Sequence, residues 1–340
     1  MKIKTWNILL VIFILLASCK NDNGTIFVKS FEKEYFLESE NVGPVGHFAS
    51  PYLINQVDSL IFVADSKLYK KENFFVYVIN IKTNKLVDSI CPFGDGPEEF
   101  NYVTDIKVDK KKNIWFFDDM KKQLFYYTNS DIGTFKNLKS VYLPVNSFGM
   151  YKIGVLNDST FVGSGNIENA RLIYFDNNEN IISNKGEYPK GVKVSWAEAQ
   201  LDYNYATKNI VLAYNIFDII QIFNQDGDLI KTLRVKSKDN LKTKELSNGK
   251  VDYNICYYSV LTTNGYIYAL YAGKPLLQGD DSWRQGSYIQ VFTIEGEPVC
   301  LYKLEDPIVG FTIDEENRII YGINKFKDQP LTKYKLPQNE

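Results

Sequence analysis

The chain has 340 residues, with 39 Lys and Arg against 41 Asp and Glu, so its formal net charge is −2. This near-neutral balance, a pI of about 5.7 and the dispersal of the lysines argue against a nucleic-acid-binding protein. Hydrophobic residues make up 45% of the chain and aromatic residues 15%. That content is ample for several hydrophobic cores.

The first residues have the pattern of a targeting segment. Two lysines precede an apolar run at 7–18, which is too short to cross a bilayer core of about 30 Å as a helix but suits a signal peptide. The sequence LASC, ending at Cys19, resembles the lipobox of bacterial lipoproteins. The resemblance implies that residues 1–18 are removed and that Cys19 is acylated, with 19–24 as a short tether. The alternative is an ordinary secretory signal with a chance cysteine.

The rest of the chain, 25–340, repeats a unit of roughly 50 residues six times, a period typical of propellers and arrays. Each unit has a turn, two apolar strands, a second turn and a further strand. The first turns fall near Asp58, Lys110, Asp158, Lys208, Asn264 and Glu315.

The strands that follow these turns are rich in β-branched and aromatic residues, as in LIFVAD, NIWFFD, NIVLAY and YIYALY. No segment has a convincing helical stripe with caps. The sequence therefore predicts an all-β fold, a six-bladed β-propeller of four-stranded antiparallel blades. The last repeat supplies only three strands, so we expect an N-terminal strand within 25–37 to close that blade, antiparallel to 331–336.

A family resemblance appears at 94–127. The segment Gly94-Asp95-Gly96-Pro97-Glu98-Glu99-Phe100, followed by VTDIKVDKKKNIWFFDD, resembles a pattern of TolB-like and NHL-like six-bladed propellers. Together with the lipobox it resembles the propeller lipoproteins of Gram-negative bacteria, which implies a fold and a place in the cell envelope, anchored to the outer membrane. It implies no catalytic residues. We expect the glycines and Pro97 to shape the crossing between blades, with Phe100 buried there, and a ligand contact by Asp95 or Glu98 is the alternative.

Candidate binding residues lie in loops that the propeller topology places on one face, here called the long-loop face. The 272–287 loop combines an aromatic ring, a guanidinium and two carboxylates, which could grip a sugar or a peptide. The candidates are Trp283, Arg284, Asp280, Asp281, Trp196, His47 and Asp95. The alternative is that these side chains pack within their loops or form ion pairs.

Catalytic and metal chemistry are constrained by the residue inventory. With one histidine, His47, a multi-histidine metal centre is impossible, and a Ser-His-Asp hydrolase would have to use that residue. No G-x-S-x-G segment is present. The spacing of Cys91, Cys256 and Cys300 matches no metal motif, so we interpret them as buried thiols. We expect no metal and no cofactor.

Three functions remain open. The first is a non-catalytic, membrane-anchored envelope protein, periplasmic or surface-exposed, that binds a glycan, a peptide or a partner protein on the long-loop face. The second is a carboxylate-based glycoside hydrolase or lyase, although the doublets Asp118-Asp119 and Asp280-Asp281 suggest turns. The third is a structural subunit of an envelope complex. A deep axial pocket with paired carboxylates would favour the enzyme, and a broad apolar patch the subunit.

Overall fold

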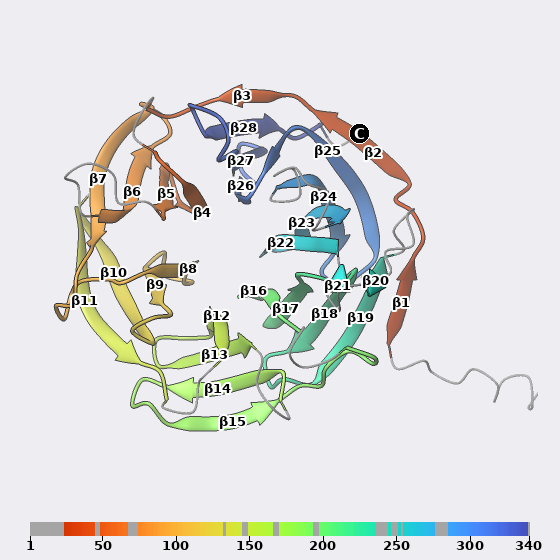
Figure 1. Ribbon diagram of the computed structural model, residues 1–340, viewed down its shortest axis with the longest axis horizontal. Helices are drawn as coiled ribbons and strands as arrows, with labels where there is room; N and C mark the ends of the chain where they lie inside the picture. The colour runs from red at the N-terminus through yellow and green to blue at the C-terminus, as the bar shows by residue number, and fades with distance from the viewer. Residues whose placement is uncertain are drawn as a thin grey trace, which may run out of the picture.

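The computed structural model describes the ranges 24–44, 48–66, 74–131, 134–144, 149–165, 170–192, 197–235, 244–245, 251–252, 254–275 and 285–338. Within these ranges all regular structure is strand, and six sheets stand around a central axis (Figure 1). None of the described segments forms a helix that could cross a membrane. The prediction of a six-bladed, all-β propeller is confirmed.

Blades one to three are each built from four consecutive antiparallel strands, with the first strand nearest the axis (Figure 1). Blade one contains β4 (Pro51–Val57), β5 (Leu60–Asp65), β6 (Phe74–Asn80) and β7 (Lys85–Pro92). Blade two contains β8 (Val103–Val108), β9 (Ile114–Asp118), β10 (Gln123–Asp131) and β11 (Thr134–Tyr142). Blade three contains β12 (Met150–Val155), β13 (Thr160–Gly165), β14 (Leu172–Asp176) and β15 (Ile181–Lys185).

Blades four to six each also receive a strand from the N-terminal segment. Blade four contains β16 (Ala199–Asn204), β17 (Asn209–Tyr214), β18 (Ile219–Asn224) and β19 (Leu229–Val235). Blade five contains β22 (Asn254–Thr262), β23 (Tyr266–Pro275), β24 (Gly286–Thr293) and β25 (Pro298–Ile308), and blade six contains β26 (Gly310–Asp314), β27 (Ile319–Ile323) and β28 (Leu331–Lys335). A two-stranded sheet of β20 (Lys244–Glu245) and β21 (Val251–Asp252) lies between blades four and five in the chain.

The middle strands of the blades are buried along nearly their whole length. Every residue of β5 and β9 is buried, as are all but the first residue of β17. Each middle strand has a neighbouring blade on both faces, which explains why its sequence is mainly apolar. The hydrophobic cores accordingly lie between blades, and one of them joins β5 and β6 to β8, β9 and β10.

The predicted closure of the last blade is correct in principle but wrong in its residues. The closing strand is β3 (Ser39–Asn41), antiparallel to β28. The expected segment instead forms β1 (Thr25–Val28), parallel to β19, and β2 (Lys33–Leu37), parallel to β25. Val28 and Leu37 are buried in the layers beside blades four, five and six, and each such burial stabilises the fold by about 1.5–3 kcal/mol. The N-terminal segment is therefore a strap around three blades.

Other local predictions are confirmed. Lys110, Lys111 and Lys112 are exposed at the β8–β9 turn, where Lys111 pairs with Asp158 and Lys112 with Asp58 of the neighbouring hairpins. The cysteines Cys91, Cys256 and Cys300 are free and buried.

Candidate ligand-binding cavity on the propeller axis

The innermost strands of all six blades, β4, β8, β12, β16, β22 and β26, line a cavity of 460 Å³. Such a cavity is expected where the first strands of a propeller converge on the axis. Its volume lies in the range of small-molecule sites, about 300–1,000 Å³. The inner strands begin on the long-loop face, and the lining includes residues at their starts, such as Tyr52, Gln200 and Gly310, together with Lys325 from the β27–β28 loop.

One wall of the cavity is charged. It is formed by blades two to four, which contribute Asp105 and Lys107 from β8, Lys152 from β12 and Asp202 from β16. Asp105 and Lys107 are two residues apart in one strand and therefore project on the same side of it. We call these four side chains the charged wall.

Lys107 connects blades that are not neighbours in the ring. Its Nζ donates to the carbonyl oxygen of Leu201 at 2.6 Å and lies 3.8 Å from Asp202 Oδ1. It also lies 3.6 Å from Asp105 Oδ2 in its own strand. The lysine thus reaches past blade three to blade four. Because it is next to the last residue of β8, this contact is at the end of the cavity away from the long-loop face.

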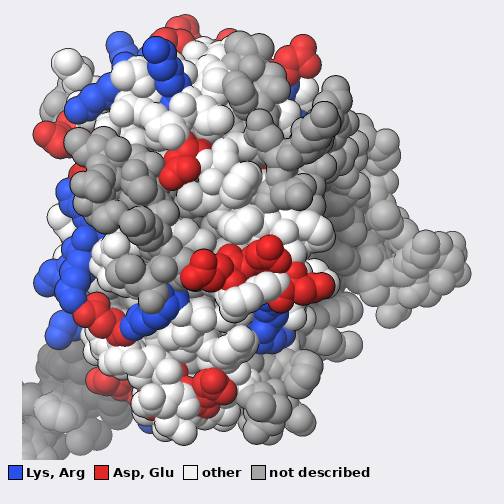
Figure 2. Space-filling model, turned by 90° about the vertical axis from the view of Figure 1, so that its left-hand side faces the viewer, with Lys and Arg blue, Asp and Glu red and all other residues white. Residues whose placement is uncertain are grey.

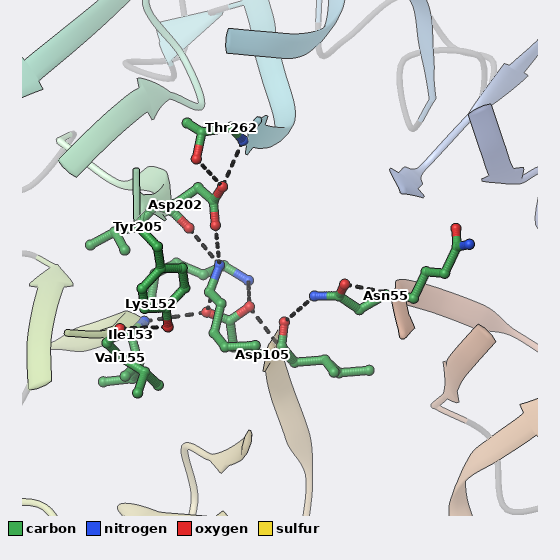
Figure 3. A network of polar contacts seen from close by, with 12 residues as sticks. Asn55, Asp105, Lys152, Ile153, Val155, Asp202, Tyr205 and Thr262 are labelled. Atoms are coloured by element: carbon green, nitrogen blue, oxygen red, sulfur yellow. Dashed lines mark hydrogen bonds and ion pairs between the residues drawn. The ribbon is translucent and has the colours of Figure 1, made fainter. Parts of the chain in front are cut away.

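Asp202 is held between Lys107 and blade five. Its Oδ2 accepts hydrogen bonds from the backbone N–H of Thr262 at 2.6 Å and from the Thr262 hydroxyl at 2.8 Å (Figure 3). Burial raises the pKa of the Asp202 carboxyl above its usual value, while Lys107 and Thr262 act in the opposite direction. The carboxylate is therefore an acceptor in a network that joins three blades.

Asp105 is held in a similar way between blades two and three (Figure 3). Its Oδ2 accepts from the backbone N–H of Ile153 at 3.2 Å, and its Oδ1 accepts from that of Ile106 at 3.1 Å. Lys152 Nζ lies 4.0 Å from Asp105 Oδ1 and donates to the carbonyl oxygen of Thr104 at 2.9 Å. Both cavity carboxylates thus accept hydrogen bonds that position them firmly.

Two further polar contacts join neighbouring blades close to the axis (Figure 3). Asn55 of blade one donates to the carbonyl oxygen of Ile106 at 3.0 Å. The Tyr205 hydroxyl, just after β16, donates to the carbonyl oxygen of Val155 at 2.7 Å. Hydrogen-bonded networks of this kind rigidify a site, so the charged wall is preorganised.

The opposite wall is mainly aromatic and aliphatic. It is formed by the inner strands of blades five, six and one, which contribute no charged side chain to the described lining. Its larger members are Tyr52, Leu53, Ile54, Tyr258, Val260, Leu261, Val309 and Phe311. We call this set the apolar wall. Lys325, beside the ring of Phe326 at 5.2 Å from its centroid, stands at the long-loop end of this side.

Comparison with protein families identifies the fold. The model of the family described as "TolB-like 6-blade propeller-like" matches residues 30–316. The chain belongs to this TolB-like propeller family. The comparison with curated proteins finds no match.

Solved structures show the same architecture for this TolB-like propeller. A Bacteroides fragilis protein described as a "putative exported protein" is 16% identical, with 92% of this chain and 99% of that chain covered and a TM-score of 0.59. A member of the DUF4221 family from Bacteroides vulgatus is 10% identical, with 90% and 96% covered and a TM-score of 0.55. Virginiamycin B lyase from Staphylococcus aureus with quinupristin is 12% identical, with 88% and 100% covered and a TM-score of 0.53. At these identities the likeness shows the fold alone.

Most of the loop residues singled out from the sequence are not part of the described structure. This group, which lies outside the described residues, comprises Trp283, Arg284, Asp280, Asp281, Trp196, His47 and Cys19. Asp95 is described and is exposed in the loop between β7 and β8. It does not line the axial cavity.

The structural interpretation of the 94–100 motif is supported by its packing. Phe100 is fully buried, and its ring centroid lies 4.0 Å from that of Phe125 in the core between blades one and two. The Glu99 carboxylate accepts from the backbone N–H of Gly96 at 2.8 Å, which closes the loop on itself.

On the side of the ring that carries β7 and β11, basic and acidic side chains are interspersed (Figure 2).

The Asp118-Asp119 doublet is a turn, as expected. Buried Asp118 accepts backbone hydrogen bonds from Asn101 at 2.6 Å, Met120 at 3.0 Å and Lys121 at 2.9 Å. Its carboxylate therefore fastens the incoming loop of blade two to the end of β9 and is fully used by the fold. Asp65 does the same in blade one, where it accepts from Ser50 at 2.9 Å.

Sequence reasoning missed the charged wall. Asp105 and Lys107 were visible within the VTDIKV part of the family motif, where two charged residues alternate with apolar ones in an expected strand. Charged residues inside an innermost strand would have been a usable signal, because that strand alone faces the axis. The contact between Lys107 and Asp202, by contrast, joins blades two and four and forms only when the blades close into a ring. The sequence alone therefore gives no signal for it.

Proposed function

We propose that this TolB-like propeller is an envelope protein, acylated at Cys19, that binds a saccharide in its axial cavity. The observation that carries the proposal is the division of the cavity into the charged wall and the apolar wall. A sugar ring has hydroxyl groups around its edge and C–H groups on its faces, so it needs both kinds of surface. A few fixed polar groups opposite an apolar surface are typical of small-molecule sites.

The long-loop face supplies the entrance in this proposal. Lys325 and the starts of the inner strands belong to that face. The loop residues Trp283, Arg284, Asp280, Asp281, Trp196 and His47 would form the rim. Trp283→Ala should then weaken binding by about 2 kcal/mol, since aromatic residues dominate recognition sites.

Envelope location rests on two supports. The lipobox resemblance ending at Cys19 predicts an anchor, and a protein with the same fold is described as exported. Cys19→Ala should give a folded protein that no longer incorporates labelled fatty acid. Continued labelling of the variant would show that another residue is acylated.

Binding is tested with a glycan array on the soluble 24–340 chain, followed by calorimetric titration of any hit. Lys152→Met and Tyr258→Ala change the charged and apolar walls, and each should weaken binding at least about tenfold, or 1.4 kcal/mol. Lys112→Ala, on the opposite face, is the control and should leave binding unchanged. If both wall variants bind like the wild type, the cavity is not the site.

A carboxylate-based hydrolase or lyase is the second candidate. It is favoured by two cavity carboxylates, Asp105 and Asp202, which both contact Lys107, and by burial that raises the pKa of Asp202, because a carboxyl group with a raised pKa can serve as a general acid. Against it, Lys107 holds both carboxylates and each already accepts other hydrogen bonds. Incubation of the glycan hit with wild type and Asp202→Asn decides, since only an enzyme gives product that the variant fails to release.

A further inference from the structure

The outer strands of the N-terminal strap expose aromatic side chains. Phe27 in β1 is 62% exposed and Phe36 in β2 is 58% exposed, among the largest values for apolar residues in the described part of the chain. Their neighbours Val28 and Leu37 are buried. This alternation means that one side of each strap strand packs on the blades while the other presents a phenylalanine.

Each exposed phenylalanine is paired in register with a cationic residue. Phe27 is opposite Arg234 of β19, and Phe36 is opposite Lys303 of β25. Ile230, also in β19, is 44% exposed. β1 and β2 follow one another along the same side of the ring (Figure 1). Glu34, two residues before Phe36, is exposed on the same side of β2, so the positive charges are those of Arg234 and Lys303 in the neighbouring strands. Apolar rings beside such cations suit the boundary between lipid headgroups and acyl chains.

The tether restricts which side of the ring can approach a membrane. Only four residues separate Cys19 from Gly24, so the five steps from Cys19 to Gly24 span at most about 18 Å when fully extended. A domain of this length is roughly 50 Å across. An anchor at Cys19 would therefore hold the blade-four side, where β1 begins, close to the bilayer, and the far side of the ring away from it.

We propose that the strap side of the ring, formed by β1 and β2, rests on the lipid bilayer surface. Phe27 and Phe36 would enter the interfacial layer, and Arg234 and Lys303 would face lipid phosphates. The propeller axis would then lie parallel to the membrane, which leaves the long-loop face open to ligand from the side. This orientation rests on the proposed acylation of Cys19.

The orientation is tested with the lipidated full chain reconstituted in phospholipid vesicles. Phe27→Cys and Phe36→Cys are each labelled with an environment-sensitive fluorophore. The native Cys91, Cys256 and Cys300 are buried, so the labels go to the introduced thiols. Both labels should show a blue shift on reconstitution and should be quenched by lipids brominated in their acyl chains.

Phe326→Cys is the matched control, because Phe326 is 50% exposed and lies next to a lysine on the long-loop face. Its label should show neither change. Shielding at 326 without shielding at 27 and 36 would overturn the proposal in favour of a ring that sits with its axis upright. No shielding at any position in acylated, vesicle-bound protein would also overturn it. Fatty-acid labelling of Cys19 reports separately on the anchor, and its failure would overturn both the anchor and the orientation.

Discussion

The two walls of the axial cavity come from equivalent strands and yet differ in chemistry. Blades two to four supply Asp105, Lys107, Lys152 and Asp202, whereas blades five, six and one supply mainly aromatic and aliphatic groups. The middle strands of blades one, two and four are buried along nearly their whole length and are mainly apolar, because each is covered on both faces. Packing between blades therefore fixes the middle strands, while the innermost strands are free to diverge. The difference teaches that the repeat leaves its innermost strands free to carry the binding specificity that we propose.

The largest effect is expected on the charged wall itself. Lys107→Met would leave Asp105 and Asp202 without their shared cation, and the lysine side chain is only 15% exposed. Removing one partner from such a buried network should lower the free energy of unfolding by about 3 kcal/mol. Urea denaturation measures the change. Lys152→Met is the control, because its longer contact to Asp105, 4.0 Å, predicts a smaller loss. Equal losses of stability in the two variants would mean that the contact of Lys107 with blade four contributes no more to stability than the contact of Lys152 with Asp105.

A carboxylate outside the cavity separates stability from binding. Asp118→Ala would leave four backbone N–H groups without their acceptor and should cost about 2 kcal/mol of stability. It should leave affinity for a cavity ligand unchanged. The neighbouring Asp119→Ala should cost less than about 0.5 kcal/mol, since it removes only a partly exposed ion pair with Lys122. A loss of ligand affinity in Asp118→Ala would mean that a residue outside the axial cavity also determines binding.

A substitution in the apolar wall should weaken ligand binding more than it lowers stability. Tyr258 is half-buried beside the core between blades five and six and lines the cavity, and Tyr258→Leu should cost about 1 kcal/mol of stability through lost contacts. Its effect on saccharide affinity should be larger than its effect on stability, because the exposed part of the ring supplies part of the stacking surface. Paired denaturation and calorimetric titration measure both quantities. Unchanged affinity would remove Tyr258 from the site.

The smallest effect concerns pH. Because burial raises the pKa of Asp202 above the ordinary 3.8, the folded state binds this proton more tightly than the unfolded state. The resulting stability is fully present below pH 3.8 and is lost as the pH rises through the folded-state pKa. The wild type should therefore lose stability relative to Asp202→Asn as the pH rises over this window. If the wild type instead gains stability relative to Asp202→Asn as the pH rises, then Lys107 lowers the pKa of Asp202 by more than burial raises it.

The sequence was sufficient to predict the repeat, the turns and the buried role of Phe100, because these depend on local patterns and on layers that every blade shares. The strap was not predictable in the same way. Its strands β1 and β2 are short, and whether Val28 and Leu37 bury against blades four to six depends on how the chain ends meet. The charged wall was half visible, since Asp105 and Lys107 belong to one motif, but their contact with Asp202 spans 95 residues of chain from Lys107 to Asp202 and exists only in the closed ring.

A crystal structure with a saccharide from the binding screen tests the central claim most directly. The sugar should lie in the axial cavity, with its ring against Tyr258 and its hydroxyl groups directed at Lys107 and Asp202. A sugar found instead in the tyrosine-lined groove of 370 Å³ beside Tyr35, with the axial cavity free of it, would contradict the account.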